Sequence, residues 1–382
     1  MVSSSEFEVN GVPVELEGRT DVQFKLAYPK RPGAVIDPKI WLGEAVTIFG
    51  KREKAGSAVI AKQAVFTCFQ PRSVLVSAVI DAILPSVAGV AAGDVAIRAD
   101  GYTVLIGSKT ARTALAPLGA DEPVRTSLWV RFEGVLRGDG VVVADSIELS
   151  PNTRSEHETS MRRRWEYEPA GVAADAKQSG GSRNYSGMNY KLIPTDADTA
   201  LQARVKAIGE KLVPAYLRAM RPDDPGSINL RFAVVDSSSL RDALGLPSGV
   251  VLVPHHLVVR LENDSQIAAL LAAEIAFVIE RQGKVDLINP DWKRQLKWDS
   301  VGGAIPGGYL AVGAVQERQL WGLIEQSDRV SLGLMRDAGY DLDEAPKMRR
   351  LLSSVIALLF DPTPMSPRAA YLYQILGTVW QQ

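Results

Sequence analysis

Cysteine and histidine are scarce in this chain. Its 382 residues include one cysteine, Cys68, and three histidines. A single cysteine excludes an intramolecular disulfide framework and a cysteine-rich metal site. Cys68 has Val65, Phe66 and Phe69 as sequence neighbours, so we expect a buried structural thiol rather than a nucleophile. Chemistry that needs imidazole must use the three histidines, which are His157, His255 and His256.

Charge of one sign is not in surplus either. The chain has 43 Lys and Arg residues against 44 Asp and Glu residues, so its formal net charge is −1. A dedicated nucleic-acid binder normally carries a basic surplus, and we therefore expect no nucleic-acid partner. Apolar residues make up 46% of the chain, which is enough for the packed cores of two or three domains.

Long apolar runs are also lacking. The first residues have neither the basic start nor the apolar core of a secretory signal, so an exported or periplasmic location requires that a leader has been removed. The most apolar stretch, 74–97, is interrupted by Asp81, Pro85 and Gly89. We therefore expect no transmembrane span and predict a buried helix over Ser73–Leu84 that ends at Pro85.

Two β-rich modules are predicted, over 6–70 and 96–150, joined by a helical connector over 71–95. Both modules are rich in β-branched and aromatic residues between glycine-bearing turns. The second repeats the plan of the first: the hairpin 46–65 resembles the hairpin 129–149, and Val9-Asn10-Gly11 mirrors Ala99-Asp100-Gly101. The pattern indicates an internal duplication of a small barrel or sheet, of which an OB-like barrel is one form.

The second half of the chain is predicted to be mainly helical. Residues 151–194 carry charges of both signs and a Ser-Gly-Gly-Ser run, which favours a polar linker. From Thr195 onward apolar residues recur at helical spacing, with Pro214 expected to split one helix. The fold class expected is therefore α+β, with duplicated β modules followed by a helical domain over 195–382 that holds a small sheet.

One predicted helix, 264–282, carries a carboxylate on its apolar side. Asn263 and Gln266 form a capping box before it, and Gly283 is a stop after it. Glu274 lies on the apolar face, where an ionised carboxylate needs a hydrogen-bond partner, an arginine or water. Arg329 is one candidate for that partner. The apolar stripe consists of Ile267, Leu270, Leu271, Ile275, Val278 and Ile279.

The order of motifs around Glu274 resembles a known family. A strand at 232–236 precedes a Pro247-Ser248-Gly249-Val250 turn and then the helix with 270–278. Downstream come Gln326-Ser327-Asp328, a segment 334–341 that ends in Ala-Gly-Tyr-Asp, and a proline-rich run that ends at Arg368. This arrangement is similar to the zinc metallopeptidases that include the CAAX prenyl protease, HtpX-type proteases and periplasmic chaperone-proteases (peptidase family M forty-eight). The resemblance implies a zincin-type domain over 195–382.

The resemblance also implies a zinc site that this chain has lost. The family's helix carries His-Glu-x-x-His, and here Ala273 and Phe277 stand at the two histidine positions. Gln326 stands at the position of the third ligand, a glutamate, whereas Asp328 is kept as a supporting residue behind the ligands. Alanine and phenylalanine cannot bind a metal, and a neutral amide is a poor zinc ligand. We therefore expect no cofactor, and Glu274 is a general-base position without a metal-bound water.

The function implied is that of a pseudopeptidase, a catalytically inactive protein that binds peptides or partner proteins in the former cleft. Two alternatives stay open. One is an active metalloendopeptidase with zinc ligands displaced to His255, His256 or Glu325. The other is a structural or assembly protein that acts through its β modules. The strand near Val250–Val253 is expected to pair with an extended peptide. The residues expected to line the cleft and bind the peptide are Pro247, Ser248, Gly249, Val250, Val251, Leu252 and Val253.

Overall fold

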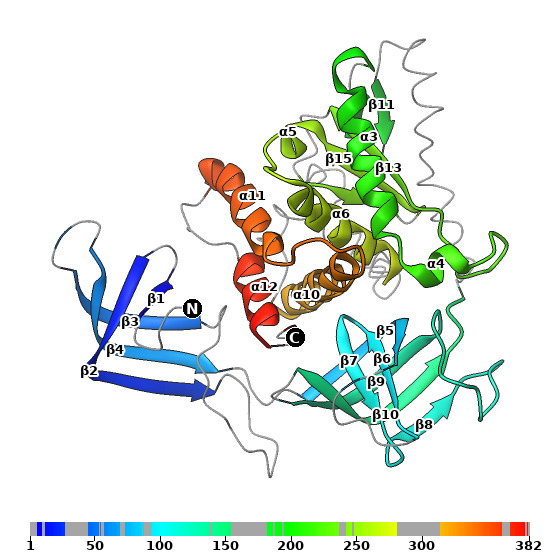
Figure 1. Cartoon of the computed structure of the whole chain (residues 1–382), viewed down its shortest axis with the longest axis horizontal. Coiled ribbons are helices and arrows are strands. Elements are labelled where there is room, and N and C mark those ends of the chain that lie inside the picture. The colour runs from blue at the N-terminus through cyan, green and yellow to red at the C-terminus, as the bar shows by residue number, and fades with distance from the viewer. Residues whose placement is uncertain are drawn as a thin grey trace.

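The computed structural model has an α+β architecture with three sheets (Figure 1). It describes residues 6–9, 12–26, 45–52, 54, 57–68, 73–85, 87, 93–137, 140–153, 182–185, 188–192, 195–236, 242–246, 248–280, 314–360, 367–378 and 380. Two sheets come from the first 150 residues, and the third sheet is accompanied by the helices of the second half.

The first sheet has four strands in the order β1-β2-β4-β3. A β1–β2 hairpin and a β3–β4 hairpin are joined by the parallel pairing of β2 with β4. Phe66 and Ala64 are the buried centre of one face, and the Phe7 ring lies 5.8 Å from that of Phe66. The strands are β1 (Glu6–Val9), β2 (Val12–Leu26), β3 (Ala45–Arg52) and β4 (Val59–Cys68).

The second sheet closes into a barrel. Its order is β7-β6-β5-β9-β10-β8, and a further parallel pairing of β7 with β10 joins the ends. β7 and β8 follow one another along β10 and act as one broken strand, so the barrel is five-stranded, which is compatible with an OB-like module. The strands are β5 (Ser73–Leu84), β6 (Val95–Ala99), β7 (Tyr102–Ile106), β8 (Ala111–Ala114), β9 (Trp129–Leu136) and β10 (Val141–Ser150).

The pairing agrees with the predicted duplication. The β1–β2 hairpin, in which Val9 pairs with Val12, corresponds to the β6–β7 hairpin, in which Ala99 pairs with Tyr102. The parallel pairing of β2 with β4 corresponds to that of β7 and β8 with β10, and the antiparallel β3–β4 pair corresponds to β9–β10. The Asn-Gly and Asp-Gly pairs that repeat in the sequence therefore stand between the strands of equivalent hairpins, although Asn10 and Gly11 themselves lie outside the described residues.

The helical connector predicted over 71–95 is wrong. Ser73–Leu84 is strand β5, which pairs with both β6 and β9 and so completes the barrel. The second module accordingly spans 73–150 rather than 96–150. The segment follows the strand period of two at its start, because Val74 is buried whereas Leu75 is 61% exposed. Its continuously apolar middle is buried against the barrel core on one face and the helices on the other, a pattern that periodicity does not separate from a helix.

The third sheet runs in the order β11-β12-β13-β15-β14. Its β11–β12 hairpin lies inside the predicted linker 151–194, and β12 pairs with β13 through Leu192 and Val235. The linker prediction is therefore wrong at its end, because pairing with the distant strand β13 holds this polar hairpin in the sheet. The strands are β11 (Ser182–Tyr185), β12 (Met188–Leu192), β13 (Arg231–Asp236), β14 (Leu244–Gly245) and β15 (Val250–Pro254).

The helix predicted around Glu274 is central, as expected. α6 begins after Asn263, whose side chain accepts a 2.9 Å hydrogen bond from the Gln266 N–H, and it is buried along most of its length. Pro214 separates α3 from α4, as predicted, whereas Gly283 lies outside the described residues. The helices are α3 (Thr195–Leu212), α4 (Ala215–Ala219), α5 (His255–Val258), α6 (Asp264–Ile279), α10 (Ala314–Asp337), α11 (Glu344–Phe360) and α12 (Pro367–Thr378).

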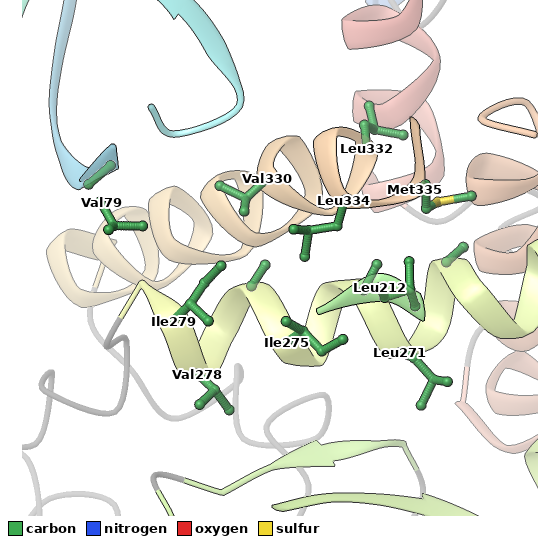
Figure 2. Close-up of a cluster of buried hydrophobic side chains, with 14 of the residues drawn as sticks. Val79, Leu212, Leu271, Ile275, Val278, Ile279, Val330, Leu332, Leu334 and Met335 are labelled. Atoms are coloured by element: carbon green, nitrogen blue, oxygen red, sulfur yellow. The ribbon is translucent and has the colours of Figure 1, made fainter. Parts of the chain in front are cut away.

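The helices and the barrel share one apolar core. Figure 2 shows α6 and α10 running antiparallel, with Ile279 and Leu334 reaching into the space between them. Val79 of β5 lies near the C-terminal end of α6 and belongs to the same cluster of buried side chains. No helix in the described part of the chain is long and apolar enough to cross a membrane.

Buried ion pairs join the barrel to α10. Arg329 donates to the Asp100 carboxylate at 2.5 Å and to the Asp100 carbonyl at 3.1 Å, and its guanidinium lies over the Tyr102 ring. Arg98 of β6 bridges Asp81 at 2.7 Å and Asp337 at 2.9 Å. Arg98, Asp81, Asp100 and Arg329 are all buried, so the outer face of β6 is covered by α10.

Candidate functional site

Glu274 is hydrogen-bonded to the edge of the third sheet. Its Oε2 accepts a 2.8 Å hydrogen bond from the Gly245 N–H of β14. The Leu246 N–H donates to the Val250 carbonyl, and because hydrogen-bonded pairs alternate along antiparallel strands, the Gly245 N–H points away from β15. A Cβ on Gly245 would lie 2.7 Å from the Glu274 carbonyl oxygen. Glycine at this position therefore lets α6 pack directly on the edge strand, where the carboxylate satisfies its outward N–H.

The environment of Glu274 favours its neutral form. Burial raises the pKa of Glu274 to about 7, and the nearby Asp242 carboxylate adds to the rise. The Gly245 N–H and the guanidinium groups of Arg349 and Arg368 act in the opposite direction without cancelling it. A carboxyl group with such a pKa exchanges its proton near neutral pH, which is a property of functional acids and bases as well as of structural ones.

Asp328 lies in the same group of charges as Glu274. Its buried carboxylate accepts two hydrogen bonds from Arg368, at 3.0 Å from Nε and 2.6 Å from Nη2. Arg349 Nη2 lies 3.7 Å from Asp328 Oδ1, and Arg349 Nη1 lies 3.9 Å from Asp242 Oδ2. We call these five residues, Asp242, Glu274, Asp328, Arg349 and Arg368, the charged cluster.

The sequence pointed to part of this cluster only. It singled out Glu274, Asp328 and Arg368 but not Asp242 or Arg349. Arg349 lies on the buried face of α11 beside the exposed Arg350. A charged residue at a position on the apolar face of a helix was the signal in the sequence that could have identified Arg349.

Arg329 is not the partner of Glu274 or of Asp328. It faces the barrel, where Asp100 and the Tyr371 hydroxyl bind its guanidinium. Neighbours along a helix point about 100° apart, so Asp328 and Arg329 serve different surfaces of α10. The hydrogen-bond partner observed for Glu274 is instead the backbone N–H of Gly245.

The positions where the resemblance places zinc ligands do not fit a metal. Ala273 is buried and Phe277 is half-buried, and neither can donate an electron pair. Gln326 Nε2 donates a 3.1 Å hydrogen bond to the Ser77 carbonyl of β5, and Glu280 Oε2 accepts one of 3.1 Å from the Val79 N–H. The C-terminal end of α6 and the middle of α10 therefore meet the backbone of the barrel.

Displaced ligands do not gather in the described residues. β15 ends at Pro254, and His255 and His256 lie in the single helical turn α5 that follows it. Within the described ranges, no group of three or more His, Cys, Asp and Glu side chains is placed to hold a metal ion.

The strand expected to bind a peptide lies inside the sheet. β15 pairs with β13 on one side, and on the other side Val251 and Leu252 pair with β14. Val250, Val251, Leu252 and Val253 are fully buried, so the expected pairing with a peptide at Val251 and Leu252 is wrong. Strand β14, which covers this edge of β15, has only two residues and is too short to show a strand period in the sequence. Of the turn residues, Ser248 is buried, Gly249 has a φ of +94°, and Pro247 lies outside the described residues.

No model of a known protein family matches this sequence, and no curated protein matches it. The resemblance to zinc metallopeptidases stays a prediction that rests on the motifs and their order.

Replacing Glu274 by glutamine is expected to stabilise the protein at about pH 8 by about 1–3 kcal/mol. Because burial raises the pKa of Glu274 above its unfolded value, its contribution to stability is present at low pH and is lost as the pH rises from about 4.5 to 7. Glutamine keeps an oxygen for the Gly245 N–H and has no charge to bury. Denaturant unfolding measures the free energy of unfolding at about pH 5 and about pH 8. Between these two pH values it should fall less in the variant than in the wild-type protein. Equal losses in both proteins would contradict this role.

Proposed function

We propose that this chain is a metallopeptidase-like protein without catalytic activity, which acts by binding a peptide or a partner protein. The observation that carries the proposal is the hydrogen bond from Gln326 to Ser77. The residue at the third ligand position is committed to the barrel, and the residues at the other two positions, Ala273 and Phe277, cannot bind zinc.

The order of the elements supports a zincin-type ancestry for the second half. Strand β13, the turn at Ser248-Gly249, strand β15, helix α6 and helix α10 follow one another as the resemblance requires. Asp328 and Arg368, both retained from the family pattern, form a buried ion pair. Retained surroundings with replaced ligands are the pattern expected after loss of catalysis, so this ion pair supports the proposal.

The use of Glu274 supports binding rather than hydrolysis. A general base must reach a water molecule or a substrate proton, whereas one oxygen of this carboxyl group is held by the Gly245 N–H. Since β14 covers Val251 and Leu252 of β15, we propose that the partner binds elsewhere on the helical domain. The charged cluster, in which Glu274 is half-buried and the Arg368 side chain is 21% exposed, is the place that the geometry favours.

The proposal predicts that the purified protein holds much less than one zinc per chain after exposure to zinc and dialysis. It also predicts that the protein shows no chelator-sensitive hydrolysis of casein. Metal analysis and a fluorescent casein assay measure the two, with Glu274→Gln and Glu280→Gln as matched variants on the same helix. Chelator-sensitive hydrolysis that is lost in Glu274→Gln but kept in Glu280→Gln would overturn the proposal, because it would make Glu274 a working general base.

A further inference from the structure

Arg349 is a buried guanidinium group with unused hydrogen-bond donors. It is 5% exposed, and within the described part of the chain its Nε and Nη2 have no hydrogen-bond partner. Its contacts with Asp328 and Asp242, at 3.7 and 3.9 Å, are ion pairs longer than hydrogen bonds. Because buried donors without partners are costly, they are rare in folded proteins and call for a physical reason.

The two unused nitrogens lie on the same edge of the guanidinium group. Together Nε and Nη2 form a fork that matches the two oxygens of a carboxylate. Arg368 uses the same two nitrogens to hold Asp328. Asp328 is therefore already occupied in this way by one arginine, and the equivalent fork of Arg349 is left for another carboxylate.

A ligand can reach the charged cluster from solvent. Of the two guanidinium groups in the cluster, that of Arg368 holds Asp328, whereas Arg349 Nε and Nη2 have no hydrogen-bond partner among the described residues. The Asp242 side chain is 19% exposed and Glu274 is half-buried, so the cluster reaches solvent on this side. In such a partly dry setting, a two-point hydrogen bond to a guanidinium group is stronger than it is in water.

We propose that Arg349 binds the carboxylate of a ligand through its Nε and Nη2. Two sources supply this chemistry: the C-terminal carboxylate of a peptide and a small free carboxylic acid. A peptide C-terminus would specify the ligand of the binding function proposed above, so this form of the proposal rests on that function. Binding of a small acid does not rest on it.

Titration calorimetry of the full chain tests the site with three probes. They are acetyl-tetra-alanine with a free C-terminal carboxylate, the same peptide as its C-terminal amide, and sodium acetate. We expect the free acid to bind and the amide not to bind. Arg349→Lys, which keeps the charge without the fork, should weaken binding by at least about tenfold. Arg350→Lys, on the exposed side of the same helix turn, should leave it unchanged.

The outcomes separate the sources and decide the proposal. Binding of the peptide acid well above that of acetate supports a peptide C-terminus, and equal binding of acetate supports a small acid. Equal binding of the peptide acid and its amide, or unchanged binding by a folded Arg349→Lys, overturns the site. If that variant does not fold, the Arg349 Nε–H resonance of the wild-type protein must shift on addition of acetate or the peptide acid, and no shift with either overturns the proposal. Chelator-sensitive hydrolysis would refute the pseudopeptidase function but leave this result untouched.

Discussion

Replacing Arg329 by methionine is expected to destabilise the protein by about 3–5 kcal/mol, which is the typical cost of removing one partner from a buried ion pair. Methionine fills most of the volume of the arginine stem, so the loss is mainly that of the charge and its hydrogen bonds. The Asp100 carboxylate, which is 1% exposed, would remain in the interface without its cation. Denaturant unfolding measures the difference in the free energy of unfolding.

The pH dependence of this variant identifies the cause. Burial raises the pKa of Asp100 to about 6 even with Arg329 beside it, and removing the cation raises that pKa further. A group with a raised folded-state pKa destabilises the protein as the pH rises through that value. The effect of Arg329→Met should therefore be smaller at about pH 5 than at about pH 8.

Two further variants test whether the destabilisation by Arg329→Met is electrostatic. Arg336→Met, on the same helix but with a side chain that is 40% exposed, should cost less than about 1 kcal/mol. Adding Asp100→Asn to Arg329→Met should recover part of the loss, because asparagine tolerates the φ of 54° at this position and carries no charge. A double variant as unstable as the single one would contradict an electrostatic origin.

Replacing Gly101 by alanine is expected to destabilise the protein by about 2–5 kcal/mol. Gly101 has a φ of +70°, where an L side chain is strained by roughly 1–2 kcal/mol. In addition, its Cβ would lie 2.5 Å from the backbone carbonyl group of Arg329, and a helix backbone cannot move aside as a flexible side chain does. The variant should therefore push the barrel away from α10.

Gly93→Ala separates the two contributions. Gly93 has a φ of +94°, but a Cβ there would meet no atom of the described residues within 4 Å. Its replacement should cost only the backbone strain, roughly 1–2 kcal/mol. Thermal or denaturant unfolding of both variants measures the difference. Equal losses for Gly93→Ala and Gly101→Ala would show that the contact between the β6–β7 turn and α10 is not tight.

Local chemistry in the sequence determined several elements of this protein. Asn263 and Gln266 marked the start of α6, Pro214 marked a helix break, and Gly339 takes the left-handed φ of +70° expected after a helix. The repeated turns revealed the shared pairing of the two β modules. Each of these features depends on residues close together in the chain, so their side chains and backbone preferences are enough to specify them.

Other features were decided by tertiary contacts. Ser73–Leu84 forms a strand because β6 and β9 lie on either side of it, and Leu244–Gly245 forms an edge strand because β15 pairs with it. The partners of Arg329 come from the barrel, more than 200 residues earlier, and from α12.

The candidate site divides in the same way. The sequence by itself determined that Ala273 and Phe277 cannot bind a metal and that Gln326 is a poor zinc ligand, because ligand chemistry belongs to the residue type. Only the tertiary structure decided that Glu274 binds the Gly245 N–H and that Arg349 lies beside Asp242 and Asp328. Charge pairing and burial depend on which distant segments the fold brings together, and no spacing along the chain encodes them.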